Sequence, residues 1–213
     1  MKNEEIKKHY KFLLSIHGKS EKAVQYTDRY SQWARFARLM QFIKKDYSIL
    51  DYGCGLGHLY EFMKKNNYTG NYCGTDILED FIFHCRQSYS EDKRANFMVI
   101  DDTKDLPSTY DFIVVSGVFN NKRNNNEEFM LETISAMFNA CRVGIALNAI
   151  STYVDYEENN LFYYSPEKLF SFTKKNLRGH PIISHNYKLK DQGYPHDYTV
   201  TVFKEPQIPD FNI

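Results

Sequence analysis

The stretch SILDYGCGLGHLYEF, residues 48–62, places three glycines within five residues directly after a short apolar run. Asp51 stands at the end of that run, and no lysine adjoins the glycines. A glycine loop between a strand and a helix lets a ligand approach the backbone at the carboxyl end of the strand. The stretch therefore predicts a nucleotide-type site with an acid beside it instead of a lysine.

The chain around this loop alternates between two kinds of apolar pattern. From residue 46 to 150, short apolar runs are followed by segments with helical spacing, which predicts βαβ units and a parallel sheet covered by helices on both faces. Five strands can be counted by Ile150. Two further apolar runs, 181–189 and 196–204, flank the turn-rich KDQGYP of residues 190–195. They predict an antiparallel hairpin that closes one edge of the sheet.

Residues 1–45 differ from the rest, because both of their apolar segments have helical spacing. Segments 4–16 and 30–45 carry this spacing and are separated by HGKS at residues 17–20, so both are predicted to be helices. We therefore expect an N-terminal helical extension at residues 1–45 and an α/β domain at residues 46–213.

The charge balance and the cysteine pattern weigh against several classes of protein. Lysine plus arginine and aspartate plus glutamate number 27 each, which gives a net charge of zero and no overall field to attract a nucleic acid or an anionic membrane. The four cysteines lack paired spacing and are expected to be free thiols. No signal peptide is recognised in the charged N-terminus, and no apolar run approaches the ~20 residues of a membrane helix. We expect a cytoplasmic protein without membrane or nucleic-acid partners.

Two common phosphate-binding patterns do not fit the glycine loop. A P-loop needs G-x-x-x-x-G-K-[ST], but the second glycine of that pattern falls on His58. The dinucleotide pattern G-x-G-x-x-G needs a third glycine at His58 or at Tyr60, where it would allow close packing under a pyrophosphate. The missing glycine weakens the case for NAD.

The remaining pattern, D-x-G-x-G-x-G at Asp51, Gly53, Gly55 and Gly57, resembles motif I of the class I S-adenosylmethionine-dependent methyltransferases. S-adenosylmethionine carries an ammonium and a sulfonium but no phosphate, so a carboxylate suits it better than a lysine. The resemblance implies a Rossmann-like sheet of seven mostly parallel strands with an antiparallel closing strand, and an N-terminal helical lid. It also implies S-adenosylmethionine as cofactor, S-adenosylhomocysteine as product and no metal.

The family's other elements imply further cofactor-binding residues. Asp76, followed by Ile77, ends the second strand in YCGTDI, where the family's acid binds both ribose hydroxyls; a carboxylate can accept two such hydrogen bonds. Ser116, after the fourth strand, would form the floor of the site beside the transferred methyl group.

Three more positions have alternative roles. An acid after the third strand contacts the adenine amine in the family, and Asp101 and Asp102 both occupy that place; either could instead cap the next turn. His58 either touches the cofactor or only begins the helix after the loop.

Sequence signatures that the chain lacks reduce the number of possible classes of methyl acceptor. The stretch after the fourth strand reads SGVFNN, residues 116–121, in place of the [DNS]-P-P-[YFW] of enzymes that methylate base amines. No Pro-Cys dipeptide occurs, and Ser116 stands where metal-dependent relatives have an aspartate. A small-molecule acceptor is the best remaining class, and an anionic one follows if Arg29 and Arg35 line the pocket.

The expected catalytic residues are His196, Arg35 and Tyr163. Histidine titrates near physiological pH and is a natural general base. Asp197 follows His196 directly, but neighbours on a strand point to opposite faces, so Asp197 is not expected to orient His196.

The sequence thus predicts a methyltransferase that acts on a small metabolite or a sugar- or capsule-type intermediate. A nucleoside-binding module without catalysis is the alternative from a different class, and a nucleic-acid methyltransferase is third because of the neutral charge. The acceptor atom and the oligomeric state stay open.

Overall fold

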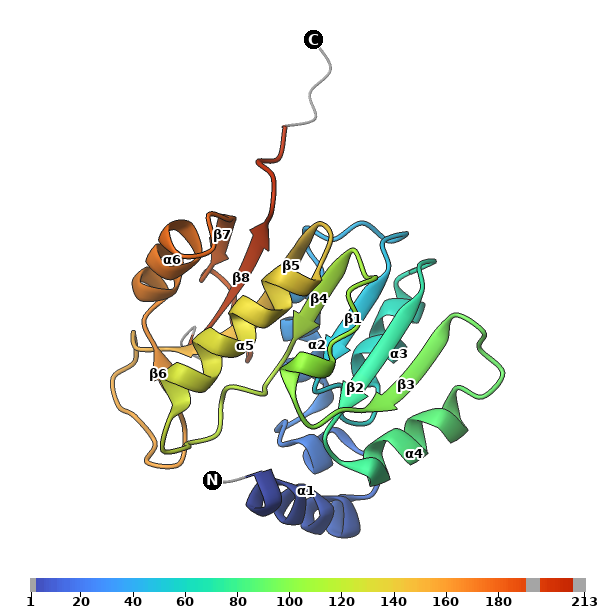
Figure 1. Cartoon of the computed structure of the whole chain (residues 1–213). Helices are drawn as coiled ribbons and strands as arrows, with labels where there is room; N and C mark the ends of the chain where they lie inside the picture. The colour runs from blue at the N-terminus through green and yellow to red at the C-terminus, as the bar shows by residue number, and fades with distance from the viewer. Residues whose placement is uncertain (1–2, 191–195, 209–213) are drawn as a thin grey trace.

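A single mixed sheet forms the central layer of the computed structural model, which describes residues 3–190 and 196–208 (Figure 1). The strand order is β3-β2-β1-β4-β5-β8-β7, with β6 paired to β5 off this path. The strands in chain order are β1 Ile49–Tyr52, β2 Tyr72–Asp76, β3 Ala95–Val99, β4 Phe112–Val115, β5 Gly144–Ser151, β6 Tyr163–Tyr164, β7 His180–Ser184 and β8 Asp197–Phe203.

The pairing of the strands confirms the predicted Rossmann-like class. Strands β1 to β5 pair in parallel, and β8 runs antiparallel to both β5 and β7. The described residues form eight strands instead of the expected seven, because the two-residue β6 adds a parallel pairing at the end of β5. The predicted turn at residues 190–195 lies outside the described residues, except for Lys190.

Helices cover both faces of the sheet because the parallel strands are apolar on both sides. In β1, Ile49 belongs to one core cluster and Leu50 to the other. The first cluster packs against α2 (Arg29–Leu39), α3 (His58–Lys65) and α4 (Glu79–Ser88), and the second against α5 (Asn126–Ala140) and α6 (Pro166–Lys175). Figure 1 shows α5 across the near face, over β4 and β5.

The N-terminal segment contains α1 (Asn3–His17), the short 3₁₀ helix η1 (Glu21–Val24) and α2. Tyr10 and Leu14 of α1 pack with Leu56 and Leu78, which follow β1 and β2, so α1 lies beyond the carboxyl ends of these strands (Figure 1). By contrast, α2 packs on the sheet itself. The boundary at residue 45 and the lid role stay predictions.

The second predicted helix is shorter than expected: α2 ends at Leu39, although the predicted helical segment extends to residue 45. The carbonyl of Lys45 accepts hydrogen bonds from the backbone N–H groups of Thr69 and Gly70, at 2.8 and 3.1 Å. Those bonds fix the chain in the turn that leads into β1, and a tertiary contact therefore overrides the helical pattern.

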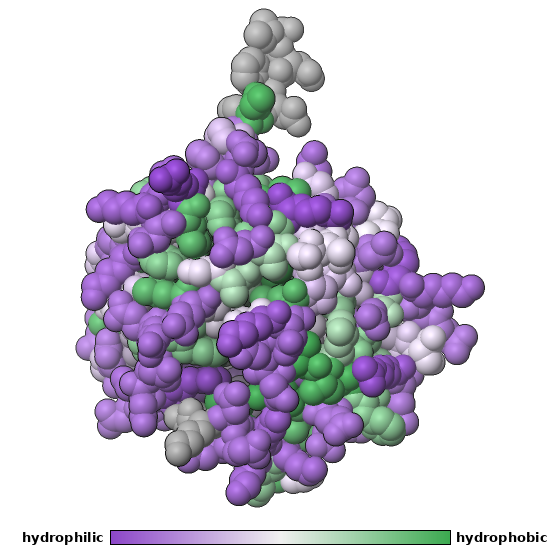
Figure 2. Space-filling view, viewed as in Figure 1, coloured by the Kyte–Doolittle hydropathy of each residue, from purple (hydrophilic) through white to green (hydrophobic). Residues whose placement is uncertain are grey.

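The surface shown in Figure 2 is mostly hydrophilic, with smaller apolar areas between the polar side chains. Within the described part of the chain, no helix combines the length and the apolar character needed to span a bilayer.

Candidate active site

The glycine loop after β1 is held against the end of β2 by its own backbone. The N–H groups of Gly53 and Cys54 both donate to the carbonyl of Thr75, at 2.7 and 2.8 Å. Gly53 and Gly55 have φ angles of +77° and +53°, a region that side chains with a Cβ rarely adopt. A Cβ on Gly55 would lie 2.8 Å from a methyl carbon of Val24. Only glycine therefore fits this backbone conformation at position 55.

Asp76, at the end of β2, is tied to the loop by both carboxylate oxygens. Its Oδ2 accepts from the N–H of Gly55 at 2.9 Å, and its Oδ1 accepts from the N–H of Leu78 at 2.9 Å. Burial raises the pKa of this carboxyl, and the backbone donors oppose the shift. Each oxygen retains a further lone pair, so the group can still accept hydrogen bonds from a ligand.

Asp51 is buried in β1 with only 2% of its surface exposed. Its Oδ2 accepts a hydrogen bond of 2.6 Å from the Tyr72 hydroxyl. Burial raises the pKa of the Asp51 carboxyl to about 7, and the nearby Asp76 charge adds to the shift. A buried carboxylate with so little solvation is a strong partner for a cationic ligand group.

These groups line a cavity of about 150 Å³, which we call the cofactor cavity. Of the residues expected to bind the cofactor, eight line it: Asp51, Gly53, Gly55, His58, Asp76, Ile77, Asp101 and Ser116. Residues of the N-terminal segment, among them Tyr10 and Tyr26, complete its wall.

Gly57 and Asp102 are not among the residues that line this cavity. A Cβ on Gly57 would lie 3.1 Å from the Tyr89 ring and 3.3 Å from the Cys85 sulfur, so this glycine allows close packing beneath the loop. Asp102 caps the short 3₁₀ helix η2 (Thr103–Asp105) by accepting from the Lys104 N–H at 2.9 Å.

Asp101 and His58 reach the cavity while also bonding to the N-terminal segment. Asp101 is exposed and forms an ion pair of 2.9 Å with Lys7 of α1. The two ring nitrogens of His58 lie 3.1 Å from Gln32 Nε2 and 3.2 Å from the Lys19 carbonyl. Burial lowers the pKa of His58, which suits a neutral ring that joins α3 to the N-terminal segment.

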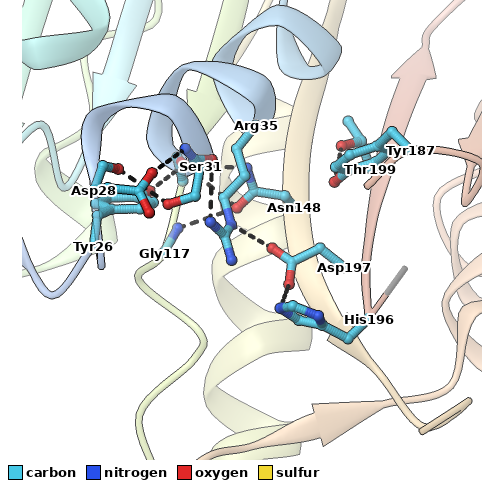
Figure 3. A network of polar contacts seen from close by, with 11 residues as sticks. Tyr26, Asp28, Ser31, Arg35, Gly117, Asn148, Tyr187, His196, Asp197 and Thr199 are labelled. Atoms are coloured by element: carbon cyan, nitrogen blue, oxygen red, sulfur yellow. Dashed lines mark hydrogen bonds and ion pairs between the residues drawn. The ribbon is translucent and has the colours of Figure 1, made fainter. Parts of the chain in front are cut away.

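Ser116 belongs to a polar network at the end of β4 (Figure 3). Its hydroxyl lies 2.8 Å from the Tyr26 hydroxyl and accepts from Asn148 Nδ2 at 3.1 Å. Asn148 Oδ1 in turn accepts from the N–H of Gly117 at 3.2 Å. Burial raises the pKa of Tyr26, so its hydroxyl keeps its proton at neutral pH.

A second cavity of about 580 Å³ adjoins the first, and we call it the acceptor cavity. The two cavities share five lining residues: Tyr10, Val24, Tyr26, Gly117 and Asn121. The structure brings the three expected catalytic residues together here, since Arg35, Tyr163 and His196 all line the acceptor cavity. The Tyr163 hydroxyl accepts from the Glu158 N–H at 2.9 Å.

Arg35 and His196 meet at a common carboxylate (Figure 3). Arg35 Nε donates to Asp197 Oδ2 at 2.5 Å, and His196 Nε2 lies 3.4 Å from Asp197 Oδ1. The Asp197 Oδ1 atom has no hydrogen-bond partner among the described residues, so the expectation that Asp197 does not orient His196 stays a prediction. The His196 carbonyl accepts from the Ser151 N–H at 2.7 Å, which continues the pairing of β8 with β5 by one residue.

The sequence does not predict the roles of Tyr10, which lines both cavities, and of Tyr72, which bonds to Asp51. The helical spacing of residues 4–16 predicts only apolar packing for Tyr10, yet its hydroxyl donates to Gln25 Oε1 at 2.8 Å and accepts from Asn121 Nδ2 at 3.0 Å. Tyr72 was not singled out, because nothing in a strand sequence shows that its hydroxyl reaches Asp51.

Comparisons with known proteins agree with this geometry. Residues 50–144 match the protein family described as "Methyltransferase domain". The Mycobacterium tuberculosis protein named "Putative methyltransferase Rv1506c" is 25% identical over 164 residues, which cover 74% of this chain and 93% of the relative.

Solved structures share the fold at low sequence identity. The magnesium protoporphyrin IX methyltransferase ChlM of Synechocystis PCC 6803, with bound SAH, superposes with a TM-score of 0.63 at 15% identity, covering 82% of this chain and 83% of that one. The methyltransferase domain of bacterial CtHen1 gives 0.63 at 12% identity, covering 81% and 99%. Together these matches confirm the resemblance to class I S-adenosylmethionine-dependent methyltransferases and the Rossmann-like fold.

Proposed function

We propose that the chain is an S-adenosylmethionine-dependent methyltransferase of the cytoplasm whose acceptor is a small molecule. The observation that carries the proposal is the pair of adjoining cavities with a shared wall at Tyr26 and Gly117. Methyl transfer needs a donor and an acceptor held in line at short distance, and two cavities that meet at one wall suit that requirement.

The residues of the cofactor cavity fit S-adenosylmethionine group by group. Asp76 suits the ribose hydroxyls, since a carboxylate can accept from both members of a vicinal diol. Asp51 supplies a poorly solvated negative charge for the ligand's ammonium group. Gly53 and Gly55 line the cavity without side chains, so the ligand chain can contact their backbone atoms. The cofactor would supply a methyl group on a positively charged sulfur, and no metal is part of the proposal.

The protein's contribution is mainly to position the two partners. Ser116 and Tyr26 hold each other at 2.8 Å at the boundary of the cavities, where the acceptor would approach the methyl group. Alignment of two reactants in this way can lower a barrier by roughly 7–11 kcal/mol.

The acceptor cavity supports a small metabolite or sugar-type intermediate in preference to a polymer. Its volume of about 580 Å³ lies in the range of small-molecule sites, roughly 300–1,000 Å³. The net charge of zero gives no general attraction for RNA or DNA.

Transfer of a labelled methyl group tests the function directly. The purified protein is incubated with methyl-labelled S-adenosylmethionine and, separately, with a small-molecule extract, total RNA and total protein. We expect label in the small-molecule reaction only. Label in RNA would replace the proposal with a nucleic-acid methyltransferase, and cofactor binding without transfer to any fraction would favour a binding module.

The variant Asp76→Ala tests the proposed cofactor site. We expect its affinity for S-adenosylhomocysteine to fall tenfold or more, which is about 1.4 kcal/mol. Asp105→Ala, at an exposed carboxylate of the neighbouring η2, is the matched control and should bind normally. Because Asp76 also accepts two backbone hydrogen bonds, a thermal melt must show that the variant is folded. Unchanged affinity in calorimetry would remove Asp76 from the site.

A further inference from the structure

A glutamine of α2 lines the cofactor cavity with one hydrogen-bonding atom unused. The Gln32 residue is only 1% exposed. Its amide nitrogen lies 3.1 Å from His58 Nδ1, whereas its amide oxygen is shielded from solvent and accepts no hydrogen bond from the described residues. Within the described lining of this cavity, Gln32 Oε1 is the one side-chain oxygen in that condition. Buried polar atoms are nearly always paired, so an unpaired one requires an explanation.

The orientation of the Gln32 amide follows from the protonation of His58. The Nε2 atom of His58 lies 3.2 Å from the Lys19 carbonyl, which can only accept, so Nε2 carries a proton and donates it. Burial lowers the pKa of His58, and a neutral ring has no second proton, so Nδ1 is an acceptor. The Gln32 amide nitrogen therefore donates to Nδ1. The Gln32 oxygen is then the amide atom that is left for a ligand.

The place of Gln32 in the cavity favours one donor group of S-adenosylmethionine. The donors of this cofactor are the adenine amine, the ribose hydroxyls and the ammonium group. Asp76 at the end of β2 suits the ribose, and Asp101 after β3 stands where the family's acid contacts the adenine amine. Gln32 instead bonds to the first residue of α3, directly after the glycine loop. That loop follows β1, the strand that carries Asp51, and Asp51 is the residue proposed to meet the ammonium group.

We propose that Gln32 Oε1 accepts a hydrogen bond from the ammonium group of the cofactor, and that His58 holds the amide in the orientation that this bond needs. This inference rests on the proposed methyltransferase function. An ammonium group carries three N–H donors, so it can bond to the Asp51 carboxylate and to the Gln32 oxygen at once. Because Gln32 belongs to α2, the N-terminal segment then completes the site for the amino-acid end of the cofactor.

Calorimetry with two ligands tests the role of Gln32. S-adenosylhomocysteine and its deaminated analogue, which has hydrogen in place of the ammonium group, are titrated into the full chain at pH 8. The variant Gln32→Met keeps the length of the side chain but cannot accept the proposed bond. We expect it to weaken the binding of S-adenosylhomocysteine about tenfold and to change the affinity for the analogue by less than about twofold.

The matched control is Gln41→Met, at an exposed position that is not among the described residues lining either cavity. This variant should bind both ligands normally. An equal loss for the two ligands in Gln32→Met would mean that Gln32 only supports the fold, and an unchanged affinity for S-adenosylhomocysteine would equally refute the proposal.

The tautomer of His58 tests the geometry in the unchanged protein, and it decides the matter if Gln32→Met does not fold. The ring signals of His58 in proton–nitrogen NMR are assigned by their loss in His58→Gln. We expect the neutral Nε2–H form at pH 8, because Nε2 faces the Lys19 carbonyl. A neutral Nδ1–H form or a protonated ring would turn the Gln32 oxygen toward the histidine and so overturn the proposal.

Failure of this inference and failure of the proposed function look different. If the unchanged protein binds neither S-adenosylhomocysteine nor its analogue, the methyltransferase function itself fails. If the unchanged protein binds S-adenosylhomocysteine and Gln32→Met does not discriminate between the two ligands, only the role of Gln32 is wrong.

Discussion

The ionisation of Asp51 should control cofactor binding near neutral pH. In the free protein, burial raises the pKa of this carboxyl to about 7, so at pH 6 only about one molecule in eleven carries the charge that would meet the ligand's ammonium group. At pH 8 about ten in eleven carry it. The affinity for S-adenosylhomocysteine should therefore rise about tenfold from pH 6 to pH 8, which is about 1.4 kcal/mol.

Calorimetric titrations at pH 6, 7 and 8 measure this dependence in the unchanged protein and in Asp51→Asn. The variant has no carboxyl to ionise, so its affinity should be weak and nearly flat with pH. Asp46→Asn, at an exposed position, should keep the full dependence, and any titration of the ligand itself contributes equally to all three proteins. In Tyr72→Phe the carboxylate loses its 2.6 Å donor, which should move the rise to higher pH. Equal pH dependence in Asp51→Asn and the unchanged protein would refute the role of Asp51.

The same carboxyl should affect stability in the opposite sense to an ordinary salt-bridged acid. Since its pKa is higher in the folded than in the unfolded state, the folded chain binds more protons between about pH 4 and pH 7. The free energy of unfolding then falls as pH rises through this window. Asp51→Asn removes the effect, so it should melt above the unchanged protein at pH 8, with the difference shrinking toward pH 4.

Three further substitutions test the loop and the packing of the N-terminal segment. Gly53→Ala and Gly18→Ala both place a Cβ on backbone of positive φ, +77° and +57°, but only the first would overlap a side chain, that of Val118. Gly18→Ala should therefore lower the free energy of unfolding by about 1 kcal/mol. Gly53→Ala should lower it clearly more and should also lose S-adenosylhomocysteine binding in calorimetry. An equal loss of stability in the two variants would contradict the tight packing of the loop. Leu39→Ala, at a fully buried position of α2, should lower the free energy of unfolding by roughly 2–5 kcal/mol in urea titrations. A cost below 1 kcal/mol would mean that α2 is a detachable extension.

The cofactor cavity could be predicted well from the sequence because its key residues follow directly from local structure. Gly53, Gly55 and Asp76 stand at the ends of neighbouring parallel strands, and the carboxyl ends of such strands meet at one edge of the sheet. Once the strands are placed, these residues converge without knowledge of any long-range contact.

The relations among the acceptor residues could not be predicted in the same way. Arg35 and Asp197 are separated by 162 positions, and their contact depends on how α2 packs against β5 and β8, two inner strands of the sheet. The approach of His196 Nε2 to within 3.4 Å of Asp197 Oδ1 likewise depends on side-chain orientations that sequence spacing does not give.

The prediction of where the second helix ends was wrong for a related reason. Apolar spacing continues past Leu39, but the Lys45 carbonyl accepts from the N–H groups of Thr69 and Gly70, which lie in the loop between α3 and β2. A periodic pattern of apolar residues cannot predict such a long-range contact. The start of α6, by contrast, can be predicted from its Ser-Pro sequence, and the Ser165 hydroxyl accepts from the Lys168 N–H at 3.1 Å.

Isothermal titration of the purified protein with S-adenosylhomocysteine, with NAD as a parallel control, tests the central claim most directly. The absence of the third glycine at His58 and the acid at Asp51 predict micromolar binding of S-adenosylhomocysteine and none of NAD. Binding of NAD alone would contradict the assignment of the glycine loop and, with it, the proposed methyltransferase function.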